Sequence, residues 1–246
     1  MDKFYLSTID ENAHHLARRY GFGLEIAEFC TPWFMDTEFQ RVDPAVREKL
    51  RCSDRYVLHA PFSELFPCAI DPQVRAVAAQ RYRQTMRIAR EYSISRIVIH
   101  GGYNPRIYFP VWYTEQSILF WREFVAEIPE GTVLYLENVF EEEPSMLCEI
   151  IEEVNDPRLR MCLDVGHVNA YSHIPVMDWL RRCAGIVGHF HLHNNDTSQD
   201  SHSQLTEGTI PMEELLSAID ELCPTATMTL ELIDAQPSVE WLMKTR

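Results

Sequence analysis

Lysine is nearly missing from this sequence of 246 residues. The chain has only three lysines, Lys3, Lys49 and Lys244, and none of them lies at the end of an apolar run that predicts a strand. A lysine that forms a Schiff base with a carbonyl substrate must project from such an element into a site. The distribution of lysine therefore argues against Schiff-base chemistry.

Positive charge is scarce as a whole. The sequence has 22 Lys and Arg against 37 Asp and Glu, which gives a net charge of −15 at pH 7. An acidic surface repels phosphate backbones and anionic lipids unless a local basic patch intervenes, and the sequence has no such patch. We therefore expect no nucleic-acid partner.

Long apolar runs are also missing. No run approaches the roughly 18 residues of a membrane span, and the start, MDKFYLSTIDEN, has no apolar core behind a basic cap. We expect neither a membrane-spanning helix nor a signal peptide. The seven cysteines are odd in number and contain no CxxC pair, so they do not resemble a disulfide framework. These features favour a cytoplasmic protein.

What the sequence does contain is a series of eight short apolar runs with amphipathic stretches between them. The runs cover residues 4–8, 22–28, 55–59, 96–100, 132–139, 160–165, 186–193 and 227–233. Near-continuous apolar strands that alternate with helices indicate a parallel sheet. Eight of them in about 250 residues favour a closed barrel. We predict an α/β fold, a single (β/α)₈ TIM barrel over residues 1–246 with a short final helix at 238–246.

Several helix boundaries can be predicted from their end signals. Gly21 ends a predicted helix over residues 10–20, and Asp71 followed by Pro72 predicts the N-cap and first residue of a long helix. A further helix is predicted over 211–222. The acidic run Glu141–Glu143 precedes Pro144, and we interpret it as complementing the N-terminus of the next helix.

Side chains that bind metals lie at or just after the ends of six successive predicted strands. The C-terminal strand ends of a TIM barrel meet at one rim, where active sites lie. Imidazoles and carboxylates without thiolates suit zinc, manganese or cobalt. Crowded acids would have raised pKa values unless a cation compensates. The sequence therefore predicts a metal site from among His59, His100, Glu137, Asp164, His167, His191, Asp200, His202 and Glu231.

The order of these motifs resembles that of a known family. The segments LHAPF, IHGG, LEN, LDVGH, HLHNND, DSH followed by LTEGTIP, and LEL resemble successive motifs of the xylose isomerase-like TIM-barrel superfamily, over residues 4–233. That superfamily contains sugar and sugar-phosphate isomerases and epimerases together with the endonuclease IV group. Two residues depart from the pattern: Asn194 replaces an Asp that many relatives have, and Thr206 replaces the first glycine of a usual GEG.

The resemblance implies a set of metal ligands. In epimerase-like members one divalent cation is bound, and the matching ligands here are Glu137, Asp164, His191 and Glu231. Endonuclease IV-like members add further ligands for a three-zinc cluster, and those positions match His59, His100, His167, Asp200 and His202. We expect one bound divalent metal ion, Mn, Zn or Co. The sequence leaves open a centre with as many as three metal ions. Within residues 188–202 we expect His191 to be the shared ligand, His189 to be structural and His193 to line the pocket at most.

Three functions stay open at this point. The first is a metal-dependent isomerase or epimerase of a sugar or sugar phosphate. In it Glu137 and Glu231 transfer a proton through a metal-stabilised enediolate, and His167 hydrogen-bonds a substrate oxygen. The second is an endonuclease IV-like zinc phosphoester hydrolase, which the nine ligand types favour and the net charge opposes for DNA. The third is a metal-stabilised binding protein without turnover.

Other residues near the same rim bear on substrate and assembly. Arg106 is the nearest basic candidate for a substrate phosphate, although it can equally be a surface residue. Aromatic side chains could wall a sugar pocket, or they could pack helices or form a homo-oligomer interface. The aromatic residues are Trp33, Phe34, Phe62, Phe66, Tyr103, Tyr108, Phe109 and Trp112.

Overall fold

Each of the eight apolar runs forms a strand in the computed structural model, which describes residues 1–246. The strands pair in parallel in chain order, and β8 pairs with β1 to close the barrel. The predicted (β/α)₈ barrel is therefore confirmed. The strands are β1 (Phe4–Ser7), β2 (Gly23–Ile26), β3 (Tyr56–His59), β4 (Arg96–His100), β5 (Val133–Glu137), β6 (Leu159–Asp164), β7 (Val187–Leu192) and β8 (Thr227–Leu230).

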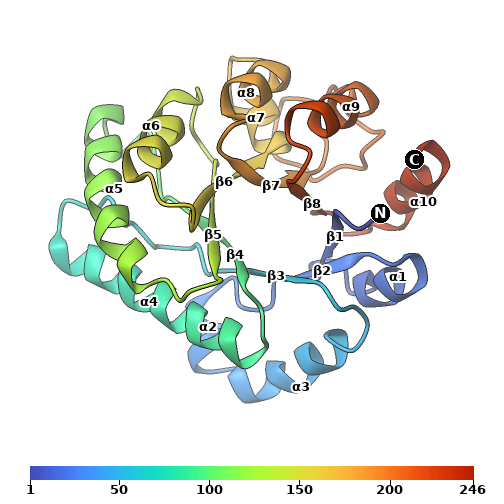
Figure 1. Ribbon diagram of the computed structural model, residues 1–246, viewed down its shortest axis with the longest axis horizontal. Coiled ribbons are helices and arrows are strands. Elements are labelled where there is room, and N and C mark those ends of the chain that lie inside the picture. The colour runs from blue at the N-terminus through green and yellow to red at the C-terminus, as the bar shows by residue number, and fades with distance from the viewer.

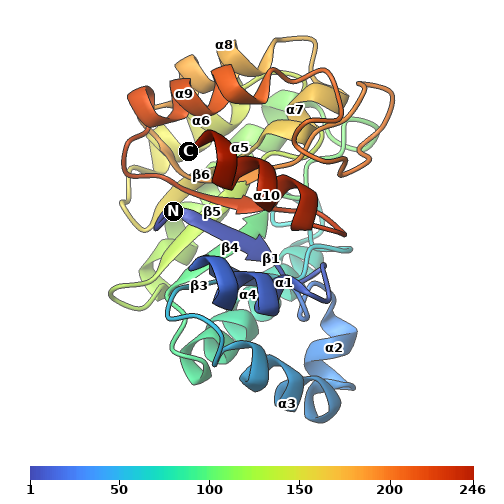
Figure 2. The ribbon, with the colours of Figure 1, turned by 90° about the vertical axis from the view of Figure 1, so that its right-hand side faces the viewer.

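The helices lie outside the ring of strands, as the view in Figure 1 shows. Both termini lie near β1 and α10, on the same side of the molecule (Figures 1 and 2). No helix has both the length and the apolar character needed to cross a membrane. The helices are α1 (Ala13–Tyr20), α2 (Pro32–Asp36), α3 (Phe39–Lys49), α4 (Pro72–Glu91), α5 (Pro110–Phe124) with the short 3₁₀ turn η1 (Val125–Glu127), α6 (Ser145–Val154), α7 (Val165–Tyr171), α8 (Val176–Cys183), α9 (Met212–Leu222) and α10 (Gln236–Thr245).

The helix ends follow the sequence signals in most places. Gly21 ends α1 with a φ of 74°, and the side chain of Asp71 caps α4 by accepting a hydrogen bond from the amide of Gln73. The interpretation of the Glu141–Glu143 run was wrong for its first residue. The first turn of α6 has no acidic residue, and Glu141 is buried, where it accepts a hydrogen bond from the hydroxyl of Tyr113.

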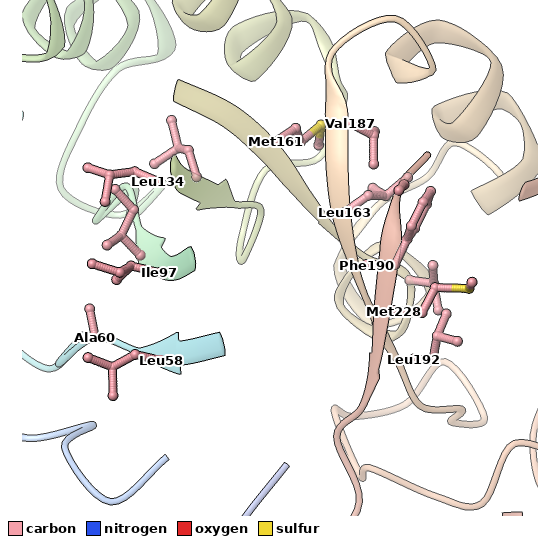
Figure 3. Packing of buried hydrophobic residues seen from close by; sticks show 14 of the residues in the cluster. Leu58, Ala60, Ile97, Leu134, Met161, Leu163, Val187, Phe190, Leu192 and Met228 are labelled. Carbon is pink, nitrogen blue, oxygen red and sulfur yellow. The ribbon is translucent and has the colours of Figure 1, made fainter. Parts of the chain in front are cut away.

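Successive side chains of each strand point to opposite faces of the barrel wall, so the buried apolar residues form two separate layers. Side chains such as Leu58, Leu134 and Phe190 face outward from the strands into the main core beneath the helices (Figure 3). A small second cluster fills the inside of the barrel and consists of Tyr5, Val57, Val98, Tyr135 and Cys162.

The inner cluster explains where polar side chains can converge. Four members of the cluster lie two residues before a polar side chain on the same strand, which therefore faces the same interior. The polar residues are His59 after Val57, His100 after Val98, Glu137 after Tyr135 and Asp164 after Cys162. The apolar layer therefore closes the N-terminal part of the barrel, and the polar layer occupies its C-terminal part.

Candidate metal centre

Four side chains from the last four strands form the first donor set. Glu137 ends β5, Asp164 ends β6, His191 lies in β7, and Glu231 directly follows β8. One ligand atom from each lies within 4.8 Å of the others. His191 Nδ1 is 3.2 Å from Glu137 Oε1, 3.1 Å from Glu231 Oε2 and 3.6 Å from Asp164 Oδ2. The structure thus brings together the four residues that the motif comparison selected.

The charge of the first donor set favours a cation. Burial would raise the pKa of Glu137, but His191 and His100 outweigh burial and hold that pKa well below its usual range. Burial likewise opposes ionisation of Glu231, and His191 lowers its pKa. The Oε2 atom of Glu137 is buried and has no partner with hydrogen-bond geometry. Three carboxylates and one imidazole match the ligand chemistry of a divalent metal.

A buried carboxylate that the sequence did not reveal lies beneath this set. Glu25 of β2 is fully buried, and its carboxylate is 3.0 Å from Nε2 of His191. The hydroxyl of Thr229 donates to Glu25 at 2.6 Å, and Nε2 of His189 lies 3.2 Å away. His189 therefore has the structural position expected for it, one layer below His191. Nδ1 of His191 is left to face the first donor set.

Two further histidines flank the outer oxygen of Glu137. His100 Nε2 is 3.1 Å and His59 Nε2 is 3.4 Å from Glu137 Oε2. Phe62 stacks on the His100 ring with the ring centroids 4.7 Å apart. Both histidines thus adjoin the first donor set beside Glu137.

A second donor set adjoins the first and consists of His167, His193, Asp200 and His202. His167 belongs to α7, and the others lie in the loop that follows β7. Asp200 and Asp164 outweigh the effect of burial and raise the pKa of His167 to about 10, and Asp200 helps raise that of His202 to about 9. The expectation that His193 lines the pocket at most was wrong. His193 is fully buried and belongs to this set.

The departure at Asn194 organises the loop that carries Asp200 and His202. The side-chain amide of Asn194 donates to the carbonyls of Leu205 and Ile210, and its oxygen accepts from the amide of Ile210. An Asp at this position could make only the accepting bond. Asn194 therefore holds both ends of the loop segment together.

Both donor sets open onto one cavity of about 410 Å³. Its polar wall includes Glu137, Glu231, His167, Asp200 and His202. Its aromatic wall contains three of the aromatic residues predicted near the rim, Phe62, Phe66 and Tyr103. It also contains two that were not predicted, Phe140 and Tyr171. The other predicted aromatics, Trp33, Phe34, Tyr108, Phe109 and Trp112, do not line it.

No arginine or lysine lines this cavity. Arg106 is exposed and borders a neighbouring hollow that shares Asn104, Phe140 and Tyr171 with the cavity. The cavity thus combines a carboxylate and imidazole floor with an aromatic wall.

Comparison with known proteins agrees with this geometry. The family model described as xylose isomerase-like TIM barrel matches residues 15–245. The chain belongs to this family. An uncharacterized protein of Methanocaldococcus jannaschii, MJ1311, is 28% identical over 204 residues, which cover 76% of this chain and 68% of that protein.

Solved structures of the xylose isomerase-like fold are similar over nearly the whole chain. A D-tagatose 3-epimerase-like protein has a TM-score of 0.81 at 22% identity, with 99% of this chain and 96% of the other covered. The TTHB071 protein from Thermus thermophilus, soaked with ZnCl₂, has a TM-score of 0.77 at 23% identity, with coverages of 99% and 97%. At these identities the likeness establishes the fold.

Proposed function

We propose that the chain is a divalent-metal-dependent isomerase or epimerase that acts on a small sugar or a related polyhydroxy carbonyl compound. The observation that carries the proposal is the pairing of Glu137 and Glu231. Both belong to the first donor set, and both line the cavity. Glu137, Asp164, His191 and Glu231 would hold the metal. Manganese, zinc or cobalt would polarise the carbonyl oxygen of the substrate and stabilise charge that develops there.

The two glutamates supply the acid and base chemistry in this proposal. Each carboxylate has a second oxygen besides the one directed at His191. One glutamate would remove the proton from the carbon next to the carbonyl, and the other would return it. His167, whose ring also lines the cavity, would hydrogen-bond a substrate oxygen and orient it.

The cavity supports a small neutral substrate. A volume of about 410 Å³ suits a single sugar, and Phe62, Phe66 and Tyr103 offer flat apolar faces against which the C–H groups of a sugar can pack. The wall has no lysine or arginine, so a phosphate group would find only imidazoles as basic side chains inside the cavity. These features favour an unphosphorylated sugar over a sugar phosphate.

The decisive experiment follows the proton. Metal-loaded protein is incubated in D₂O with a panel of ketoses and their phosphates, and proton NMR monitors the C–H signals next to the carbonyl. We expect deuterium incorporation and a new diastereomer or isomer with at least one neutral ketose. Glu213→Gln, an exposed change on α9, serves as the matched control. Complete retention of the C–H signal across the panel would refute the proposal.

A zinc-dependent phosphoester hydrolase is the second candidate. The specific observation in its favour is the second donor set, together with His59 and His100 beside Glu137. Hydrolysis of bis(4-nitrophenyl) phosphate and nicking of abasic DNA test it directly. Cleavage that Glu231→Gln abolishes, without any solvent exchange on sugars, would replace the isomerase proposal by the hydrolase. If the protein binds metal and sugar but catalyses neither reaction, the third hypothesis holds, a metal-stabilised binding protein without turnover.

A further inference from the structure

The cavity that both donor sets share lies next to a second hollow at the same rim of the barrel. This hollow has a volume of about 390 Å³ and shares Asn104, Phe140 and Tyr171 with the cavity. Its other two lining residues are Pro105 and Arg106. Because three residues border both spaces, a molecule held in the cavity can extend into the hollow.

The two spaces differ in their chemistry. The cavity contains carboxylates and imidazoles, whereas no acidic side chain and no histidine lines the hollow. The rings of Phe140 and Tyr171 meet edge to face, with their centroids 5.0 Å apart and 66° between their planes. Phe140 is 39% exposed although its side chain is large and apolar. An apolar group that covered these rings would remove their surface from water, which is favourable.

The loop on one side of the hollow is closed by its own hydrogen bonds. Oδ1 of Asn104 accepts the amide of Arg106 at 3.0 Å. The carbonyl of Asn104 accepts the amides of Ile107 and Tyr108, each at 2.9 Å. These bonds preorganise the hollow, so binding there does not have to order the loop. A preorganised surface binds at a smaller cost in conformational entropy.

Two side chains at the hollow have N–H groups without a partner in the protein. The side-chain amide of Asn104 donates no hydrogen bond, and this residue lies where the two spaces meet. Its N–H groups can donate to an oxygen that links a sugar to a substituent. The guanidinium of Arg106 is exposed and forms neither an ion pair nor a hydrogen bond. A planar guanidinium of this kind can stack on an aromatic ring.

We propose that the hollow is a second substrate subsite, which takes a flat aromatic substituent attached to the sugar in the cavity. An aromatic group matches the rings of Phe140 and Tyr171 and the planar cation of Arg106. A second sugar in the hollow would instead place hydroxyl groups against apolar rings. The substituent is on a carbon other than the carbonyl carbon, since the proton transfer needs a free carbonyl. The sugar half of this substrate rests on the proposed function, whereas the aromatic half follows from the hollow.

Pairs of glycosides that differ only in their substituent test the subsite by binding alone. Isothermal titration calorimetry measures the affinity of Mn²⁺-loaded protein for the methyl and phenyl glycosides of a panel of hexoses and pentoses. We expect a phenyl glycoside to bind at least about tenfold more tightly than the methyl glycoside of the same sugar, because its ring is buried in the hollow. The corresponding cyclohexyl glycoside, which is apolar but not flat, should bind with an affinity between these two.

Two variants show whether the phenyl group binds in the hollow. Arg106→Ala should lower the ratio of phenyl to methyl affinity about two- to fivefold, since it removes the stacked cation. Phe140→Ala should lower this ratio about two- to twelvefold, because it removes one of the two rings. Arg87→Ala, which removes an exposed arginine of α4, is the matched control and should leave the ratio as in wild type.

Failure of the subsite and failure of the proposed function give different results. If phenyl and methyl glycosides bind equally, or if no member of the panel binds, the hollow does not take an aromatic substituent. If the phenyl preference survives in both Arg106→Ala and Phe140→Ala, the aromatic group binds elsewhere and the subsite is refuted. Failure of the isomerase reaction is recognised separately, by the lack of deuterium incorporation, and leaves the ratio of affinities unaffected.

Discussion

Nε2 of His191 lies 3.0 Å from the carboxylate of Glu25, and both side chains are fully buried inside the barrel. Because the carboxylate accepts the Nε2 proton, Nδ1 of His191 is directed at Glu137, Asp164 and Glu231. Histidines that bind metals commonly donate their other ring N–H to such a carboxylate, which fixes the tautomer and raises the basicity of the ligand. We infer that Glu25 positions His191 for the metal.

Replacing Glu25 by Gln tests this role. The variant keeps the shape of the side chain and loses its charge, so we expect the affinity of the first donor set for Mn²⁺ to fall about 10- to 100-fold. Isothermal titration of EDTA-treated protein measures the change. Glu48→Gln, an exposed change on α3, should leave the affinity unaltered. An affinity for Glu25→Gln within a factor of about two of wild type would show that Glu25 does not act through His191.

Glu141 gives the fold a dependence on pH. Burial is the main cause that raises the pKa of Glu141 from 4.5 to about 7. The native state therefore binds this proton more tightly than the unfolded state. The stabilisation is fully present below about pH 4.5 and is lost as the pH rises through about 7. Glu141→Gln removes this titration.

The comparison of wild type with Glu141→Gln isolates that effect. The two proteins should have similar free energies of unfolding near pH 5. Near pH 8 wild type should be less stable than the variant by up to about 3 kcal/mol, since each pKa unit corresponds to about 1.4 kcal/mol. Urea unfolding of metal-free protein at both pH values measures this difference. A constant difference across the range would mean that Glu141 is not protonated in the native state.

The sequence was sufficient for the barrel because buried parallel strands are apolar along their whole length. It also predicted which polar side chains converge, because the C-terminal ends of parallel strands must meet at one rim. None of these inferences required knowledge of contacts between distant residues.

The residues that sequence reasoning missed depend on such contacts. Glu25 lies inside the apolar run of β2, and its partner His191 is 166 residues away and meets it only when the barrel closes. Glu141 is buried beside Tyr113 of α5, and a run of acidic residues in the sequence does not reveal this contact. His193 comes just after β7 ends, so its direction depends on the loop that Asn194 organises.

Phe62 should contribute to substrate binding more than to chemistry. Its ring lines the cavity and stacks on His100, but it is not part of either donor set. Removal of an aromatic contact typically costs about 0.5–1.5 kcal/mol. We therefore expect Phe62→Ala to raise KM for a neutral sugar roughly two- to twelvefold with kcat changed much less. Phe62→Tyr should restore KM, and a fall confined to kcat would contradict a role in binding.

Substitution of Glu231 tests most directly whether Glu137 and Glu231 transfer the proton. Glu231→Gln keeps an oxygen that can face the metal but cannot accept a proton, and general acid–base catalysis contributes about 10²- to 10⁴-fold to rates. We expect kcat to fall by at least about a hundredfold while the far-UV circular dichroism spectrum stays as in wild type. Activity is compared at saturating Mn²⁺, so that a loss of metal affinity alone would be overcome. Recovery of wild-type kcat under that condition would restrict Glu231 to metal binding and eliminate it as an acid or base.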